Sequence, residues 1–343
     1  MQPNRSHAAV ILVSLLLFSS MEGAARKEKR RPSHTKKKPP AEEAVITAEQ
    51  ANDPSVAAVL TRGATGAAVL RAQVLLDRAH FSPGEMDARF GANTQRAVMA
   101  FRQARGLERQ DAVDARTWTE LNRDTAPVVV PYAIAPGDVA GPFVKVPKEM
   151  MDKAALPALS YESPLEAIAE MFHVSPKLLL RMNPGASFTQ AGREVLVPAV
   201  TRSPLPKAAM IRVNGRDLSV AAYDDAGRVL ARYPATVGSS HDPLPVGACT
   251  VKGVGKNPVF HYNPDLFWDA HSTDTKATIQ AGPNNPVGVV WIDLSLTHYG
   301  IHGTPEPGTI GEKASHGCIR LTNWDAAELA ELVAPGMKAV LER

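Results

Sequence analysis

Cysteine is scarce in this sequence: two residues, Cys249 and Cys318, occur among 343. Two cysteines permit no more than one disulfide, and in an exported protein a single bridge is the simplest interpretation. The paired C-x-x-C spacing of many metal sites is missing as well, which disfavours a metal centre. The residues around Cys318, described below, favour a reactive thiol over a bridge.

Long hydrophobic runs are missing too. The apolar run near the N-terminus covers residues 8–18, which is short of the ~20 residues that span a bilayer. Arg5 precedes it and Gly23, Ala24 and Ala25 follow it, a pattern typical of a secretory signal peptide cleaved after Ala25. No cysteine follows the run to accept a lipid. We therefore expect export to the periplasm or cell wall, with no transmembrane segment once residues 1–25 are removed.

Excess charge of one sign is confined to residues 26–38, which hold eight basic residues and one acidic residue. Because the whole chain has a formal net charge of +3, the rest is mildly acidic, at −4. A basic tail on an acidic body is not typical of a nucleic-acid-binding domain, so we expect no nucleic-acid partner. Residues 26–53 lack periodicity, which predicts a disordered basic tether with a secondary attraction to anionic surfaces.

The remaining composition is that of a folded protein with several domains. Hydrophobic residues make up 44% and charged residues 21%, and at ~100–200 residues per domain the length favours two or three domains. The 28 prolines predict linkers between them. We expect a small all-α module at 54–125, a proline-rich linker at 126–156, a small α+β module at 157–200 and a mainly β domain at 207–343.

The first module shows three helical segments. Val69, Ala72 and Leu76 recur at helical spacing, Phe101 lies on the apolar face of a second helix, and Trp118 lies on a third. The segments RGATGAAVLRAQVLLDRA, DARFGANTQRAVMAFRQARGL and DARTWTEL resemble the peptidoglycan-binding three-helix module, with alanine replacing the usual glycine of its D-G-x-F-G turn. The resemblance implies a module that binds the cell wall, or one that serves as a structural spacer.

The second module has two short helical segments, LEAIAEMFHV and SPKLLLRMN, followed by a strand-like REVLVPAV. Its β-α-α-β pattern resembles a LysM carbohydrate-binding domain. The G-D-T that usually precedes the first helix of that family is replaced by Glu162, Ser163 and Pro164. The resemblance implies a glycan-binding role with an altered contact loop.

The C-terminal domain is predicted to be mostly β. Residues 210–238 alternate between polar and apolar, with hairpin turns at 214–215 and 225–227. Strand-like runs continue in VGACTVKGV, GVVWIDLSL and YGIHG. One helix, WDAAELAELV, is predicted near the C-terminus, with Thr322 or Asn323 as its cap.

The chemistry is concentrated between residues 299 and 321. A thiol attacks an acyl carbon as thiolate, and because a free cysteine has a pKa of ~8.5 it needs a nearby base or positive charge. On a strand, His316, Cys318 and Arg320 would share one face, while Gly317 removes side-chain bulk near an oxyanion. His302 lies 16 residues before Cys318, at the end of a strand-like run. Two other interpretations are open: a zinc site formed by His302, His316 and Cys318, and a set of inert residues.

Residues 302–304 (HGT) and 315–321 (SHGCIRL) together resemble the signature of the L,D-transpeptidase catalytic domain of the YkuD type. The resemblance runs from about residue 210 to the C-terminus and implies a β-sandwich or barrel with a cysteine nucleophile. It implies that Cys318 is the nucleophile and His302 the general base. It also implies that the pocket and the oxyanion site are shaped by Ser315, His316 and Gly317. Substrate would be bound by Arg320, with Tyr299 and Gly303.

The function implied is acyl transfer on peptidoglycan. Cys318 would attack the third residue of a stem tetrapeptide, release D-alanine and pass the acyl group to an amine of a neighbouring stem, which forms a 3-3 cross-link. The resemblance implies no metal or organic cofactor and predicts that carbapenems acylate Cys318. Three alternatives stay open: an L,D-carboxypeptidase or endopeptidase, an enzyme that attaches proteins to the wall, and a non-catalytic wall-binding protein.

Overall fold

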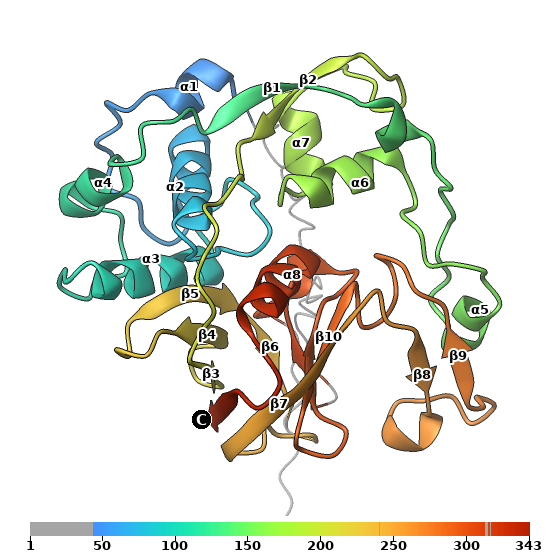
Figure 1. Ribbon diagram of the computed structural model, residues 1–343. Coiled ribbons are helices and arrows are strands. Elements are labelled where there is room, and N and C mark those ends of the chain that lie inside the picture. Colours follow the sequence, from blue (N-terminus) through green and yellow to red (C-terminus); the bar gives the residue numbers. More distant parts are fainter. Residues whose placement is uncertain (1–43, 240, 313–314, 316) are drawn as a thin grey trace, which may run out of the picture. The chain divides into compact units, whose positions relative to one another are not determined.

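The computed structural model describes residues 44–239, 241–312, 315 and 317–343 (Figure 1). The expected signal peptide and residues 26–43 of the expected tether lie outside the described residues, as does His316. Within the described part, no helix is long and apolar enough to cross a membrane. Residues 43–343 pack as one unit.

The C-terminal domain is built on a nine-stranded sheet in the order β5-β4-β3-β13-β7-β10-β11-β12-β6. Neighbours are antiparallel except for the parallel pairs β3–β13 and β11–β12. Burial alternates along β3 and β10, as it should where one face of a strand packs on a core. The strands are β3 (Met210–Asn214), β4 (Ser219–Tyr223), β5 (Val229–Pro234), β6 (Thr236–Val237), β7 (Gly247–Lys256), β10 (Val290–Leu294), β11 (Gly300–His302), β12 (Ile319–Arg320) and β13 (Lys338–Glu342).

One helix, α8 (Asn323–Leu332), packs on β10 and β11. Its N-cap is Thr322, whose side chain accepts a hydrogen bond from the Asp325 amide, so the first of the two predicted caps is confirmed. A separate hairpin of β8 (Phe260–Tyr262) and β9 (Ala277–Ile279), with the short η2 (Pro264–Leu266), packs against α5 (Met150–Ala154). The mainly β prediction for this domain is confirmed.

The three predicted helices of the first module are α2 (Ala67–Arg78), α3 (Ala92–Ala104) and α4 (Ala115–Leu121). The alanine that replaces the expected turn glycine, Ala88, has a positive φ of 59°. That is the left-handed region, in which glycine carries no steric penalty and alanine does. The turn therefore adopts the left-handed conformation that favours glycine, although alanine occupies the position.

The structure differs from the prediction at the end of the tether. Residues 48–52 form α1 (Ala48–Asn52), which begins with a capping box of Thr47 and Gln50. Ile46 and Ala51 are buried in the core of the first module. The predicted tether therefore does not extend to residue 53, because two apolar side chains without visible periodicity are enough to hold this end of the chain.

The predicted proline-rich linker also contains regular structure. β1 (Val129–Ala133) lies within it and pairs antiparallel with β2 (Glu194–Pro198), next to α6 (Pro164–Met171) and α7 (Pro176–Met182). Proline is compatible with β1 because an edge strand leaves some of its N–H groups unpaired. The first strand of the second module is therefore β1, and 30 residues separate its end from the start of α6. The 3-10 helix η1 (Pro136–Val139) lies in this interval, as does α5.

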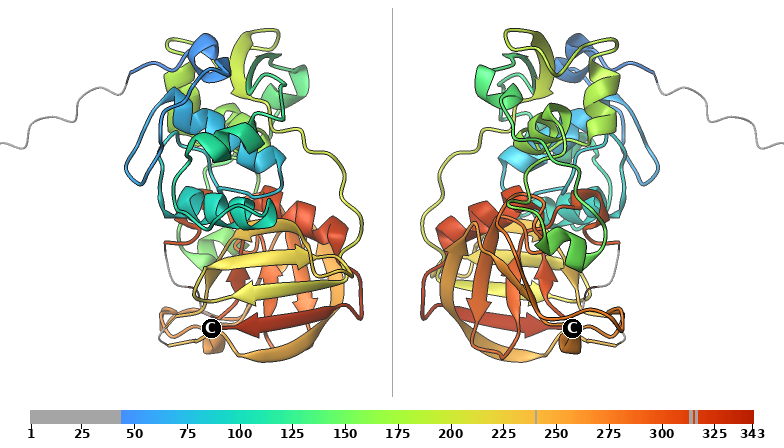
Figure 2. Two further views of the ribbon diagram at one scale, coloured as in Figure 1. Left: turned by 90° about the vertical axis from the view of Figure 1, so that its left-hand side faces the viewer. Right: turned by 90° about the vertical axis from the view of Figure 1, so that its right-hand side faces the viewer.

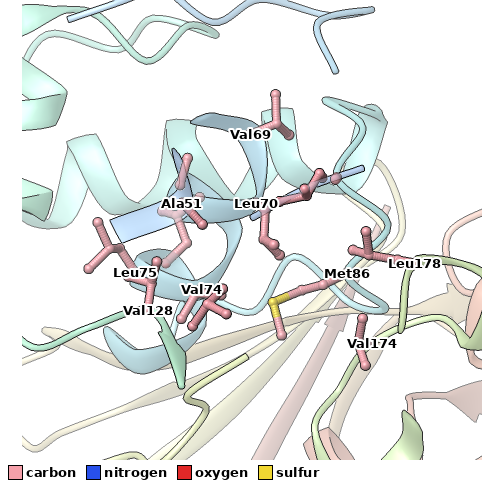
Figure 3. Close-up of a cluster of buried hydrophobic side chains, with 14 of the residues drawn as sticks. Ala51, Val69, Leu70, Val74, Leu75, Met86, Val128, Val174 and Leu178 are labelled. Atoms are coloured by element: carbon pink, nitrogen blue, oxygen red, sulfur yellow. The ribbon is translucent and has the colours of Figure 1, made fainter. Parts of the chain in front are cut away.

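The two small modules share one hydrophobic core. Met86 of the first module exchanges backbone hydrogen bonds with the second, donating to His173 and accepting from Ser175, each at 2.9 Å. In Figure 3 its side chain lies between Val74 of α2 and Val174. Neither module buries its apolar residues alone.

The first module also extends the sheet of the C-terminal domain. The Ser82 amide donates to the Arg232 carbonyl at 2.9 Å, and the Arg232 amide donates to the His80 carbonyl at 2.8 Å. Residues 80–82 therefore cover the edge strand β5, which would otherwise present unpaired backbone groups. Figure 2 shows the small-module helices on the α8 side of the sheet.

A buried ionic cluster joins these parts of the chain. The Arg202 guanidinium, 9% exposed, contacts Asp77 of α2 at 2.5 Å, Asp325 of α8 at 3.3 Å, and Glu328 of α8. His173 of the second module also contacts Asp77, at 3.2 Å. Burial raises the pKa of Asp325 to about 6, whereas Arg202 and His173 hold that of Asp77 well below its ordinary value. One cation thus compensates several acidic groups that water does not reach.

We expect Arg202→Met to lower the free energy of unfolding by about 3–5 kcal/mol, because it leaves buried carboxylates without their cation. Urea unfolding at pH 7 measures the change. Arg228→Met is the matched control: Arg228 pairs with Asp224, but its side chain is 82% exposed, and such pairs contribute about 0–1 kcal/mol. Equal losses in the two variants would contradict the role of the cluster.

Candidate active site

The short parallel pair β11–β12 assembles the candidate site. In its register Ile301 is the partner of Ile319 and His302 is the partner of Arg320. Partner residues project from the same face of a sheet, and Cys318, which directly precedes β12, is near enough to Arg320 for the two groups to interact electrostatically. The pairing therefore brings together three of the residues predicted from sequence, His302, Cys318 and Arg320.

The imidazole of His302 is held in one orientation. Its side chain is 4% exposed, and Nδ1 donates to the Gly303 carbonyl at 2.7 Å. Trp291, the β10 register partner of His302, stacks on the ring with centroids 5.5 Å apart. The hydrogen bond at Nδ1 leaves Nε2 as the acceptor in the neutral ring. Burial, with the nearby charge of Arg320, lowers the pKa of His302 to about 3.

The thiol of Cys318 is partly accessible and free. Its Sγ–H donates to the His298 carbonyl at 3.5 Å. Burial raises the pKa of the Cys318 thiol, although a hydrogen bond from Gly300 and the charge of Arg320 oppose the rise. In this state both members of the expected nucleophile–base pair are therefore neutral, because burial penalises the thiolate and the imidazolium alike.

The other cysteine is also a free thiol. Cys249 lies on β7 and is 7% exposed. Burial raises its pKa, so it is a poor nucleophile. The expectation that Cys249 packs as a small apolar residue agrees with this position.

The turn before Cys318 is shaped by Ser315 and Gly317. The Ser315 hydroxyl donates to the Cys318 carbonyl at 2.6 Å, and the Ser315 amide donates to the Gly238 carbonyl at 3.0 Å. Gly317 has φ +100°, and a Cβ there would lie 3.3 Å from the Tyr299 ring. Glycine is required at this position for backbone conformation and is favoured by space. Tyr299 thus forms one wall of the turn.

Arg320 and Gly303 complete the predicted set. Arg320 is half-buried, and burial lowers its pKa while Cys318, Glu306 and Asp269 oppose the fall. A Cβ on Gly303 would lie 2.2 Å from Asn323 Oδ1, so no larger residue fits there. Gly303 is better described as the hydrogen-bond acceptor for His302 than as a surface for substrate.

Sequence reasoning missed several residues that build the site. Trp291 stacks on His302, and Asn323, which was predicted only as a possible helix cap, lies against Gly303. His298, whose carbonyl holds the thiol, is four residues before His302, an H-x-x-x-H spacing that sequence reasoning overlooked. This spacing does not form a helical metal pair, because His298 lies in a turn with φ +65° and His302 lies on a strand.

The first module holds the loop between the two reactive residues. The Asn93 side chain of α3 donates to the Ile310 carbonyl at 2.7 Å, directly after the 3-10 helix η3 (Pro307–Thr309). Glu85 lies near Gly308, and burial raises the pKa of Glu85 to about 7. The active-site loop is therefore packed against a separate module.

The alternative zinc site has His302, His316 and Cys318 as ligands, and His316 lies outside the described residues. Among the residues that are described, no group of three or more histidine, cysteine, aspartate or glutamate side chains is placed to hold a metal ion.

Comparison with known proteins agrees with this architecture. Residues 208–341 match the family model of the L,D-transpeptidase catalytic domain (YkuD), and residues 65–121 match that of a peptidoglycan binding domain. An L,D-transpeptidase YkuD of Bacillus licheniformis is 33% identical over 178 residues, which are 51% of this chain and 90% of the relative. Its counterpart in Bacillus subtilis is 30% identical over 52% of this chain and 93% of the relative.

The L,D-transpeptidase YcfS of Escherichia coli is 31% identical over 51% of this chain and 57% of the relative. The two family models together cover the sheet, α8 and the three helices of the first module. This chain belongs to the YkuD family of L,D-transpeptidases.

Proposed function

We propose that this protein is an exported enzyme that cross-links peptidoglycan through an acyl-enzyme on Cys318. The observation that supports this most directly is the β11–β12 pairing of His302 with Arg320, together with the electrostatic interaction between Arg320 and the Cys318 thiol. These groups match the needs of acyl transfer: a nucleophile, a proton carrier and a binder for a carboxylate.

In the acylation step the Cys318 sulfur attacks the acyl carbon of the third residue of a stem tetrapeptide. Because the thiol and imidazole are both neutral at rest, the proton passes from Sγ to His302 Nε2 as the S–C bond forms, not before it. The C–N bond to the terminal D-alanine then breaks, and His302 returns the proton to the leaving amine. The Cys318 thiol must turn from the His298 carbonyl toward the imidazole for this transfer.

The developing oxyanion needs donors. Backbone N–H groups at the turn of Gly317 and Cys318 are suited to this role because Gly317 has no side chain to shield them, and Ser315 fixes the turn. Arg320, two residues beyond the nucleophile, would bind the free carboxylate of the stem. We retain His316 as a pocket residue on the resemblance alone.

In the second step an amine of a neighbouring stem attacks the thioester, gives its proton to His302 and releases Cys318, which forms the 3-3 cross-link. Water as acceptor would make the enzyme a carboxypeptidase, and a protein lysine would make it a wall-attachment enzyme. These differ in the acceptor alone, so one product analysis separates them.

The small modules support a substrate on the cell wall. The match of the first module to a peptidoglycan binding domain suits an insoluble polymer as substrate. In the second, two helices beside an antiparallel strand pair agree with the LysM-like pattern, which implies contact with glycan. A periplasmic or wall-associated location follows from this substrate and from the predicted signal peptide.

We expect the full chain, incubated with purified disaccharide-tetrapeptide, to release D-alanine and form a cross-linked dimer. Cys318→Ala abolishes both products and the acyl-enzyme, because the other cysteine, Cys249, is buried and burial raises its pKa. Cys249→Ala is the matched control and keeps full activity. Mass spectrometry of products and protein measures the outcome, and a carbapenem should add its mass at Cys318. Turnover by Cys318→Ala would remove this residue from the mechanism.

We expect the acylation rate to stay level as the pH falls from 7 to 5. A histidine of ordinary pKa, ~6.5, would be half-protonated within this range and lose activity, whereas His302, with a pKa of about 3, stays neutral and able to accept a proton. Single-turnover acylation across pH measures this. A loss of acylation rate on the acid side, with an apparent pKa near 6.5, would contradict a buried neutral base.

The same electrostatics predict slow alkylation of Cys318. Iodoacetamide reacts with thiolate, and because burial raises the pKa of this thiol the rate should climb steadily from pH 7 to above pH 9. Glutathione is the reference thiol. A rate that is already level below pH 7 would show a thiolate–imidazolium pair at rest.

A further inference from the structure

One buried side chain connects the second module to the base of the active site. Asn323, the first residue of α8, is 2% exposed. Its Nδ2 donates to Glu170 Oε1 of α6 at 3.0 Å and to the Pro283 carbonyl at 3.1 Å, and its Oδ1 accepts from the Val289 amide at 3.2 Å. Both amide hydrogens and the amide oxygen are therefore engaged, which fixes the plane and the direction of the side chain.

The oxygen of Asn323 is in tight contact with the backbone that holds His302. A Cβ on Gly303 would lie 2.2 Å from Asn323 Oδ1, and one on Gly288 would lie 2.0 Å from the same atom. Gly303 supplies the carbonyl that accepts from His302 Nδ1 at 2.7 Å. The position of Asn323 thus limits where that carbonyl can lie, and the carbonyl sets which nitrogen of the imidazole carries the proton.

Glu170 belongs to the second module, 153 residues from Asn323 in the chain. Its Oε1 accepts from Asn323 and also from the Tyr161 hydroxyl, at 3.1 Å. Burial raises the pKa of Glu170 to about 7, with Glu166 adding to the rise. Protonation does not remove the acceptor oxygen, so the contact with Asn323 persists in either form.

We propose that Glu170 is a positioning residue for the catalytic base: it fixes the Asn323 amide, which fixes Gly303 and through it the orientation and tautomer of His302. This inference rests on the proposed function, in which His302 accepts the thiol proton. It gives the second module a role inside the active site, apart from any contact with glycan. Loss of Glu170 frees one amide hydrogen of Asn323 and leaves the Pro283 carbonyl and the Val289 amide to hold the side chain with less restraint.

The test compares Glu170→Ala with Glu170→Gln in the full chain. The alanine variant should lower kcat with disaccharide-tetrapeptide by about 10- to 100-fold, by analogy with the loss of an outer hydrogen-bond partner of a metal-bound histidine, while KM is unchanged. The glutamine variant keeps an acceptor oxygen and should restore kcat. In ¹⁵N spectra of labelled histidine, the alanine variant alone should show a mixture of the two His302 tautomers.

Glu166→Ala is the matched control. Glu166 is on the same helix and accepts from Asn284 at 2.8 Å across the same junction, but it does not bond to Asn323. It should keep kcat and the wild-type His302 signal, and thermal unfolding of each variant shows that the fold is retained. Equal losses of kcat in Glu166→Ala and Glu170→Ala would overturn the inference, since the contact would then only dock the module.

Two other results would also overturn it: a Glu170→Ala variant with wild-type kcat and a single His302 tautomer, or a Glu170→Gln variant as slow as alanine. Failure of the proposed function looks different. In that case the wild-type chain forms no acyl-enzyme, or His302→Ala keeps the full rate, whatever the Glu170 variants show.

Discussion

The active site of this chain depends on the parallel pairing of two very short strands. β11 and β12 join at two register positions, and that is enough to bring His302 beside Arg320 and Cys318. Parallel strands need a crossover connection between them, and here the connection is residues 303–318, of which 303–312, 315 and 317–318 are described. The reactive thiol is at its end, and its middle is held by Asn93 of the first helical module.

Burial determines the resting chemistry of the site. The environment that orients His302, with Trp291 on its face and Gly303 at Nδ1, also removes the water that would stabilise an imidazolium. The Cys318 thiol is subject to the same penalty, and the nearby guanidinium of Arg320 favours the thiolate but opposes the imidazolium. The thiol and the imidazole are therefore both neutral at rest, which is why the proposed mechanism couples proton transfer to sulfur attack.

The small modules are structural parts of the catalytic unit. They are joined to each other by a shared core around Met86, and to the C-terminal domain by residues 80–82 on the edge of β5 and by the buried Arg202 cluster. Binding modules on flexible linkers would raise the local concentration of substrate and do no more. Modules packed in this way also position active-site groups, as Asn93 does for the loop.

The sequence by itself determined the local features. Helical periodicity predicted α2, α3 and α4 and the turn residues predicted the β hairpins, because these patterns reflect interactions between residues close in the chain. The candidate site residues His302, Cys318 and Arg320 were predicted from the resemblance of the HGT and SHGCIRL strings to a family signature. Only the tertiary structure decided which distant groups meet: β1 with β2, Arg202 with Asp77, and Asn323 with Glu170. Such contacts join residues up to 153 positions apart, and their polar partners look like ordinary surface residues until folding removes water from them.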